Sequence, residues 1–244
     1  MRRSWCLWSA VVLGLLSAGL VQSGDADKAR AIVDRAIKAV GGEDLVKKHQ
    51  AATFKEKGMY YGMGDGLPYT GNYAFQWPNK FRMEIEGVFI IVVDGDKGWM
   101  KAGDTREMSK EELTQQRYDR KAGYITTLLP LKNKAFQLSV LDEAQVDSKA
   151  AQVVKVSRQD FPEVKLFFDK DSGRLVKSEY RTKAQEEANK EVAQEAFYQG
   201  YRDVEGLQVP AKLVIKRDGK LYIEAENFDV KSHGKLDAKV FAMP

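Results

Sequence analysis

The chain has almost no cysteine and very little histidine. Cys6 is the single cysteine among 244 residues, and His49 and His233 are the only histidines. Thiolate and imidazole groups supply most zinc ligands and most nucleophiles and bases of hydrolytic sites. We therefore expect no catalytic residue, no metal and no cofactor. His49, at a helix end, and His233, in a polar turn, are expected to be solvated.

The chain also lacks a charge excess of one sign. Its formal net charge is +4, and acids and bases are interspersed, as in "KAQEEANKEVAQEAF". A protein that binds single-stranded nucleic acid combines a basic groove with interleaved aromatic side chains. No such stripe occurs, so we expect no nucleic-acid partner.

The first residues are typical of a secretory signal peptide over 1–23, cleaved near Ser23. Arg2 and Arg3 precede an apolar run that ends in small residues. The alternative is an uncleaved membrane anchor, which needs about 20 apolar residues. Cys6 lies within the signal, so the mature chain would have no disulfide and no lipid anchor. Export without disulfides favours a periplasmic location and one domain over 24–244.

The spacing of apolar residues predicts where helices and strands alternate. Residues 25–42 show helical spacing with a glycine stop. From 69 to 77 large aromatics alternate with smaller or polar residues, and 81–86 continue this pattern after Pro78, which predicts a hairpin. The run "VFIIVV" has no polar side, so its strand should be covered on both faces.

The second half repeats the order of helix and then strands. Residues 103–131 are predicted to be helical, with Ser109 and Glu112 in a capping-box arrangement and Pro130 near the end. Further strands follow, joined by turns rich in Asp and Gly. The segment 183–196 holds strong helix formers, and we predict an extended chain only from about Val192. The pattern is α+β with a mainly antiparallel sheet.

Two acids in "VVDGDKGWM" invite comparison with a calcium loop. Counted from Asp94, an EF-hand needs glycine at its sixth position and glutamate at its twelfth, but these hold Trp99 and Thr105. We therefore interpret Asp94 and Asp96 as parts of a hairpin turn. Trp99 begins the next strand and is expected to face the interior.

The remaining signal is an excess of aromatic and long apolar side chains on strands. An ordinary sandwich core would account for it. Alternatively, a strongly curved sheet leaves its concave side lined but unfilled, so that an apolar ligand completes the core. Each methylene group of an acyl chain that is buried contributes about 0.8 kcal/mol to binding. Such a ligand can therefore be bound by an apolar cavity without any catalytic residue.

Several pieces, in order, resemble the LolA/LolB-like superfamily of periplasmic lipoprotein carriers and related outer-membrane lipoprotein-sorting proteins. They are the signal with the first helix, "WPNKFRMEI", "VVDGDKGWM", "LFFDKDSGRLVKSEY", "YRDVEGLQVPAKLVIKRDGK" and "KLDAKVFAMP". Together they span nearly the whole mature chain. The resemblance implies an unclosed half β-barrel, highly curved and antiparallel, with helices covering its open side and a hydrophobic cavity between them.

The resemblance also implies a lid ending in "YITTLLPL". Where the founding carriers have an arginine before the proline of "P-N-x-F", thought to latch that lid, this chain has Trp77. The ligand is accordingly either lipoprotein acyl chains or another lipid. The candidate cavity residues are Tyr73, Phe75, Trp77, Phe81, Met83, Ile85, Trp99, Leu128, Leu129, Leu131, Leu166 and Phe168.

Three hypotheses follow for the function. The first is a monomeric, non-catalytic periplasmic binding or carrier protein for a lipophilic ligand, with a possible membrane-protein partner that receives it. The second is an envelope interaction or sensor module that uses the same fold without a ligand. The third is an enzyme acting through carboxylates, which the placement of the acid pairs at turns disfavours.

Overall fold

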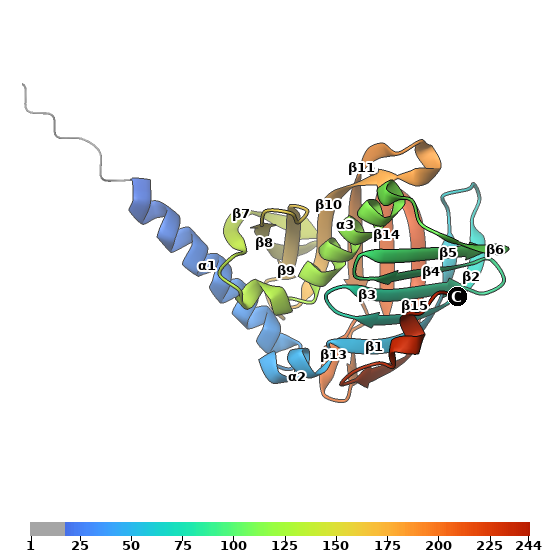
Figure 1. Ribbon diagram of the computed structural model, residues 1–244. Coiled ribbons are helices and arrows are strands. Elements are labelled where there is room, and N and C mark those ends of the chain that lie inside the picture. Colours follow the sequence, from blue (N-terminus) through green and yellow to red (C-terminus); the bar gives the residue numbers. More distant parts are fainter. Residues whose placement is uncertain (1–17) are drawn as a thin grey trace, which may run out of the picture.

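The computed structural model of the chain describes residues 18–244 (Figure 1). The predicted signal peptide lies outside the described residues, except for residues 18–23, which begin the first helix. Within the described part of the chain, no helix has both the length and the apolarity needed to cross a membrane. The helical elements are α1 (Ala18–Ala39), α2 (Glu43–Lys48), α3 (Lys110–Thr126) and the short 3-10 turns η1 (Leu129–Lys132), η2 (Gln185–Glu187) and η3 (Ala238–Phe241).

Thirteen strands form one antiparallel sheet in the order β6-β5-β4-β3-β2-β1-β15-β14-β11-β10-β9-β8-β7. Because β6 and β7 are edges that do not pair, the sheet is not closed. A two-stranded ribbon, β12 (Arg202–Val204) with β13 (Leu207–Val209), stands apart from it. The strands of the large sheet are β1 (Ala51–Tyr60), β2 (Leu67–Gln76), β3 (Lys80–Ile85), β4 (Phe89–Asp94), β5 (Lys97–Ala102), β6 (Asp104–Glu107), β7 (Gln137–Val146), β8 (Lys149–Ser157), β9 (Val164–Asp169), β10 (Leu175–Ala184), β11 (Lys190–Gln199), β14 (Lys212–Arg217) and β15 (Lys220–His233).

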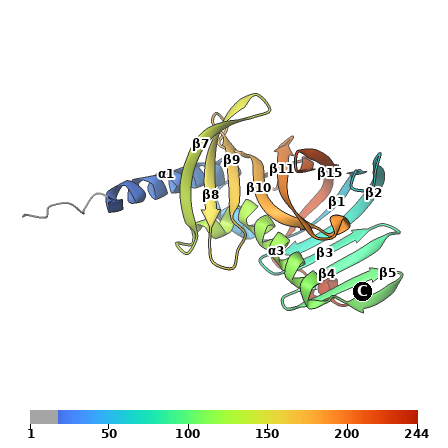
Figure 2. The ribbon, with the colours of Figure 1, turned by 90° about the horizontal axis from the view of Figure 1, so that it is seen from above.

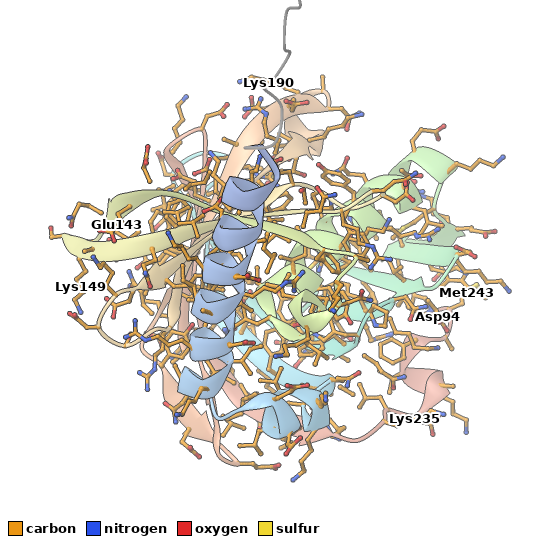
Figure 3. All side chains as sticks on the ribbon, turned by 90° about the vertical axis from the view of Figure 1, so that its left-hand side faces the viewer. Asp94, Glu143, Lys149, Lys190, Lys235 and Met243 are labelled. Atoms are coloured by element: carbon orange, nitrogen blue, oxygen red, sulfur yellow. The ribbon has the colours of Figure 1, made fainter. Side chains whose placement is uncertain are left out.

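The sheet curls around α3, which lies in its hollow (Figure 2). We call the face toward α3 the inner face and the opposite face the outer face. Helix α1 packs near the edge of the sheet that β7 forms, mainly against β7 itself (Figure 1). Seen from that side, α1 runs across the sheet in front of the remaining elements (Figure 3). The predicted α+β fold, a curved half barrel with helices over its open side, is confirmed.

The β7–β10 half of the inner face is filled by helical side chains. Val33, Ala36 and Ile37 of α1 and Ile125 of α3 are buried together with Leu166 of β9. The apolar spacing of residues 29–40 places one stripe of α1 against the strands. The chain leaves α1 through Gly41, whose φ of 123° is a backbone conformation that residues with a side chain rarely adopt. This half of the hollow is therefore a packed core.

Strand β4 is covered on both faces, as its apolar run predicts. Val92 packs on the outer face with Leu236 and Phe241 from the C-terminal segment. Val93 points to the inner face, where it lines a small cavity beside Arg117 of α3. The C-terminal segment is thus the second cover of the sheet.

Two segments differ from the prediction. Residues 104–107 form the edge strand β6 instead of the start of a helix, because they pair with β5; α3 begins after Ser109, and the predicted capping box with Glu112 is present. In 183–196, β10 extends to Ala184 and β11 starts at Lys190, two residues before the predicted strand start. Pairing of these strands overrides the helix propensity of their residues.

Candidate functional site

A cavity of about 350 Å³ lies between α3 and the inner face of the sheet. Its volume falls at the lower end of the usual range for small-molecule sites, about 300–1,000 Å³. The helices and their connections contribute Val40, Val46, His49, Gly123, Thr126, Thr127 and Leu128. The strands, the β12–β13 ribbon and residues adjoining them contribute Phe54, Phe75, Trp77, Leu175, Tyr198, Tyr201, Leu207, Gln208, Val209, Pro210, Asn227 and Val230.

A row of aromatic rings forms one wall of the cavity. Phe54 of β1 meets Phe75 of β2 edge-on, with ring centroids 6.3 Å apart, and Phe75 meets Trp77 at 5.1 Å. Residues two apart on a strand share a face, and Trp77, directly after β2, continues the alternation that places Phe75 inward. Trp77 then stacks on Tyr124 of α3 at 5.8 Å. The row therefore runs from the sheet to the helix that covers it.

Polar contacts hold α3 over the hollow. Asp119 accepts hydrogen bonds from Thr182 at 2.6 Å and from Tyr180 at 3.2 Å, both on β10. Also in the middle of the helix, Arg117 donates to Asp96 in the β4–β5 turn at 2.7 Å. These contacts tie α3 to both halves of the sheet.

Three of the predicted cavity residues line this cavity: Phe75, Trp77 and Leu128. Leu128 is buried and has a left-handed φ of 65°, where α3 gives way to η1. The predicted lid segment thus contributes directly to the wall through this side chain.

Four predicted residues lie elsewhere on the inner face. Register with β1 and β3 places Tyr73, Phe81, Met83 and Ile85 on the same side as Phe75. Phe81 lies under the guanidinium of Arg120, 4.0 Å from the ring centroid, and lines a second cavity of about 180 Å³ with Trp77. The other three line neither of these two cavities.

The remaining inward-facing candidates belong to the packed core beside the cavity. Leu131, Leu166 and Phe168 are buried in the cluster that α1 covers, and Leu129 packs partly buried against it. Helix α1 fills the space in front of these side chains. They support the cavity and do not line it.

Trp99 requires a correction, because it lies on the outer face. It is paired with Val92 across β4 and β5 and packs against the cluster that contains Leu236 and Phe241. The expectation that Trp99 faces the cavity is therefore wrong. A sequence gives the alternation of a strand but not which of its faces is inward.

The acids of "VVDGDKGWM" form ion pairs with separate partners. Asp94 binds Lys80 at 2.7 Å and Asp96 binds Arg117 at 2.7 Å. Among residues 18–244, no cluster of three or more His, Cys, Asp or Glu side chains suitable for a metal is found. The interpretation of this segment as a hairpin turn agrees with the pairing of β4 with β5.

The polar cavity residues were not identified from the sequence. His49, expected to be solvated, instead lines the cavity with its Nε2 atom buried, and burial lowers the pKa of its imidazole. Asn227 lies on β15 opposite Glu56 of β1 and also lines the cavity. Neither side chain belongs to a recognisable motif, so only the fold reveals them.

A buried acid, Glu56, also lies on the inner face and was not anticipated. It is 5% exposed, and its Oε1 atom accepts hydrogen bonds from Tyr69 at 2.7 Å and from Tyr73 at 2.8 Å. Burial raises the pKa of this carboxyl, and the two tyrosine bonds only partly oppose that shift.

Comparison with known proteins gives structural neighbours only. No protein-family model and no curated protein matches the sequence. A LolA superfamily protein from Nitrosomonas europaea aligns with a TM-score of 0.57 at 12% identity, and a DUF1329 family protein from Desulfovibrio piger with 0.57 at 11%. A putative outer membrane lipoprotein-sorting protein domain from Vibrio parahaemolyticus aligns with 0.56 at 9%. Each alignment covers 88% of this chain and 97% of the other. The predicted resemblance is thereby confirmed at the level of the fold, which is LolA-like.

Proposed function

We propose that this chain is a non-catalytic binding or carrier protein for a lipophilic ligand, which it holds between α3 and the curved sheet. The observation that carries the proposal is the aromatic and aliphatic cavity of about 350 Å³ at that position. Packed protein interiors contain few voids larger than a water molecule. A cavity of this size, walled by Phe54, Phe75 and Trp77, therefore suits an apolar ligand.

The proposed occupant is a lipid or an acyl chain of a lipoprotein. A lipid bound in the cavity transfers its apolar surface out of water, and each of its buried methylene groups contributes about 0.8 kcal/mol to binding. The LolA-like fold, shared with a protein described as lipoprotein-sorting, supports this class of ligand. We further propose that the protein is a monomer. The N-terminal sequence, with Arg2, Arg3 and the apolar run that follows, supports a periplasmic location.

Lipid extraction tests the proposal directly. The full-length protein, expressed with its own N-terminus in a bacterial host and purified without detergent, is extracted with organic solvent, and the extract is examined by mass spectrometry. We expect one lipid class at a stoichiometric ratio. The test variant is Val230→Asp, which places a charge in the cavity wall on β15. The matched control is Asp229→Asn, which changes the neighbouring exposed position.

A charge in the wall costs several kcal/mol when it is buried by an apolar ligand. Val230→Asp should therefore yield protein without lipid, while Asp229→Asn retains it. Absence of lipid from the unaltered protein, together with no binding of added lipids, would overturn the proposal. The intact mass of the purified protein reports whether the chain is cleaved near Ser23, and osmotic shock of the expressing cells reports whether it is released from the periplasm.

A further inference from the structure

The cavity has no charged side chain in its wall. Its lining contains aliphatic and aromatic residues with His49, Thr126, Thr127, Gln208 and Asn227 as its polar members besides two tyrosines, and none of the lining residues is Asp, Glu, Lys or Arg. Burial lowers the pKa of His49, which disfavours the charged imidazolium form. An ionised headgroup placed here would lose its hydration without gaining a counter-charge.

Most polar groups of the wall already have partners inside the protein. Thr126 and Thr127 donate to carbonyl oxygens of α3 at 2.8 and 2.7 Å, and Tyr201 donates to the Leu175 carbonyl at 2.6 Å. The hydroxyl of Tyr198 shares a hydrogen bond of 2.8 Å with Ser178. The hydroxyl protons of the two threonines and Tyr201 are therefore used, and what these groups still offer a ligand is acceptor capacity.

Gln208 is similarly occupied at both ends of its amide. Its Oε1 accepts from Arg174 at 3.2 Å, and its Nε2 donates to Asp203 at 3.1 Å. Arg174 and Asp203 are thereby turned toward Gln208, and a third charged residue next to this wall, Arg202, donates to the backbone carbonyl oxygen of Asn227 at 2.7 Å.

Two polar atoms of lining residues are buried without a hydrogen-bond partner in the described part of the chain. They are Oδ1 of Asn227, which can only accept, and Nε2 of His49, which accepts or donates according to its tautomer. The Asn227 amide nitrogen contacts the Pro210 carbonyl at 3.5 Å, which orients Oδ1 away from that carbonyl. A buried acceptor without a donor costs about 1–3 kcal/mol, so a ligand that supplies the donor is favoured.

We propose that the ligand has an apolar body and an uncharged headgroup that donates a hydrogen bond, a hydroxyl or an amide N–H, to Asn227 with His49 as the second contact. The inference rests on the proposed function, because it specifies the headgroup chemistry for the same cavity. The inference predicts that alcohols, monoacylglycerols and amide-linked acyl chains bind. It predicts that free fatty acids and anionic phospholipids, whose headgroups carry negative charge, bind more weakly.

Matched ligands test the inference. The full-length protein is loaded with the uncharged fluorescent probe N-phenylnaphthylamine, and the probe is displaced at neutral pH by dodecanol, dodecanamide, methyl dodecanoate or dodecanoate. All four carry nearly the same chain, but the ester only accepts and the carboxylate is charged. We expect the alcohol and the amide to displace the probe at concentrations at least about tenfold below that of the carboxylate, with the ester between them.

Variants assign the contact to its residues. Asn227→Leu keeps the size of the side chain and removes the acceptor, so it should weaken dodecanol binding about two- to tenfold and leave methyl dodecanoate unchanged. His49→Phe removes the second contact and serves as an independent variant should Asn227→Leu reduce folding, which circular dichroism reports. Asn72→Leu is the matched control, because Asn72 lies on the outer face and binds exposed Glu86.

The outcomes distinguish this inference from the proposed function. Displacement by none of the four ligands would overturn both. Equal displacement by all four, or strongest displacement by dodecanoate, would overturn the headgroup inference and leave a lipophilic binding protein. Equal loss of alcohol and ester binding in Asn227→Leu and His49→Phe would also contradict the inference, because it would mean that these side chains only shape the wall.

Discussion

The indole of Trp77 stacks on the ring of Tyr124, with centroids 5.8 Å apart and an interplanar angle of 27°. Trp77 follows β2, whereas Tyr124 lies near the end of α3, so the pair joins the sheet to its helical cover at the cavity. An aromatic pair of this kind contributes about 0.5–1.5 kcal/mol beyond the area that it buries.

A double-mutant cycle on Trp77→Leu and Tyr124→Leu measures this contact. We expect a coupling energy of about 0.5–1.5 kcal/mol in urea denaturation, since each single change already removes the ring contact. Hydrogen exchange in α3 should accelerate in both single variants. Tyr118→Leu, a partly buried tyrosine of the same helix, is the control and should show no coupling to Trp77. Additive single changes would show that the stacking does not hold α3.

Replacing Glu56 by glutamine should change how stability depends on pH. Because burial raises its pKa, the folded state binds the proton more tightly than the unfolded chain. The contribution of this group is therefore fully favourable below the ordinary value of 4.5 and decreases as pH rises above it. Glu56→Gln retains an acceptor for Tyr69 and Tyr73, so it should be more stable than the native chain at neutral pH.

Urea denaturation between acid and neutral pH checks this sign. The stability difference between Glu56→Gln and the native protein should grow as pH rises. Glu86→Gln, the same change at an exposed position, is the matched control. Glu56→Leu provides a contrast, since it leaves two tyrosine hydroxyls without their acceptor at about 1–3 kcal/mol each. A stability difference that shrinks with rising pH would contradict the raised pKa.

Filling the cavity from α3 should block binding without unfolding the protein. A Cβ atom on Gly123 would lie 3.3 Å from the Trp77 ring, and the residue lines the cavity. Gly123→Leu adds a side chain there and improves helix propensity by about 0.8–1 kcal/mol, which offsets the tight contact. We expect at least about tenfold weaker binding of N-phenylnaphthylamine in a fluorescence titration. Thr114→Leu adds an exposed leucine to the same helix and should bind the probe normally.

The two polar attachments of α3 should differ in strength. Asp119→Ala removes the acceptor of Thr182, which is buried, and of Tyr180, and should cost about 2–3 kcal/mol in urea denaturation. Arg117→Ala removes only the exposed pair with Asp96 and should cost about 0–1 kcal/mol. Added salt should reduce the second effect and leave the first nearly unchanged. Equal costs would show that burial does not determine the strength of the two contacts.

The helices and most strands were predictable because their signals are local. The apolar spacing in 25–42, the capping box of Ser109 with Glu112 and the alternation in 69–77 each depend on neighbours a few residues away. Strand β6 and the start of β11 were less predictable, because pairing with distant strands decides them. The curvature that leaves the sheet open followed from the ordered resemblance, not from any single motif.

The sequence by itself determined that aromatic side chains are abundant on the strands. It also determined that few histidine and cysteine side chains are present to act as catalytic groups or metal ligands. Only the tertiary structure decided which rings meet the cavity: Trp77 lies in its wall, while Trp99 packs on the outer face against the cluster that contains Phe241. The same holds for His49 and Asn227, which come from separate parts of the chain. Composition and period are properties of neighbouring residues, whereas the face of a strand and the convergence of distant polar atoms depend on register and packing across the whole sheet.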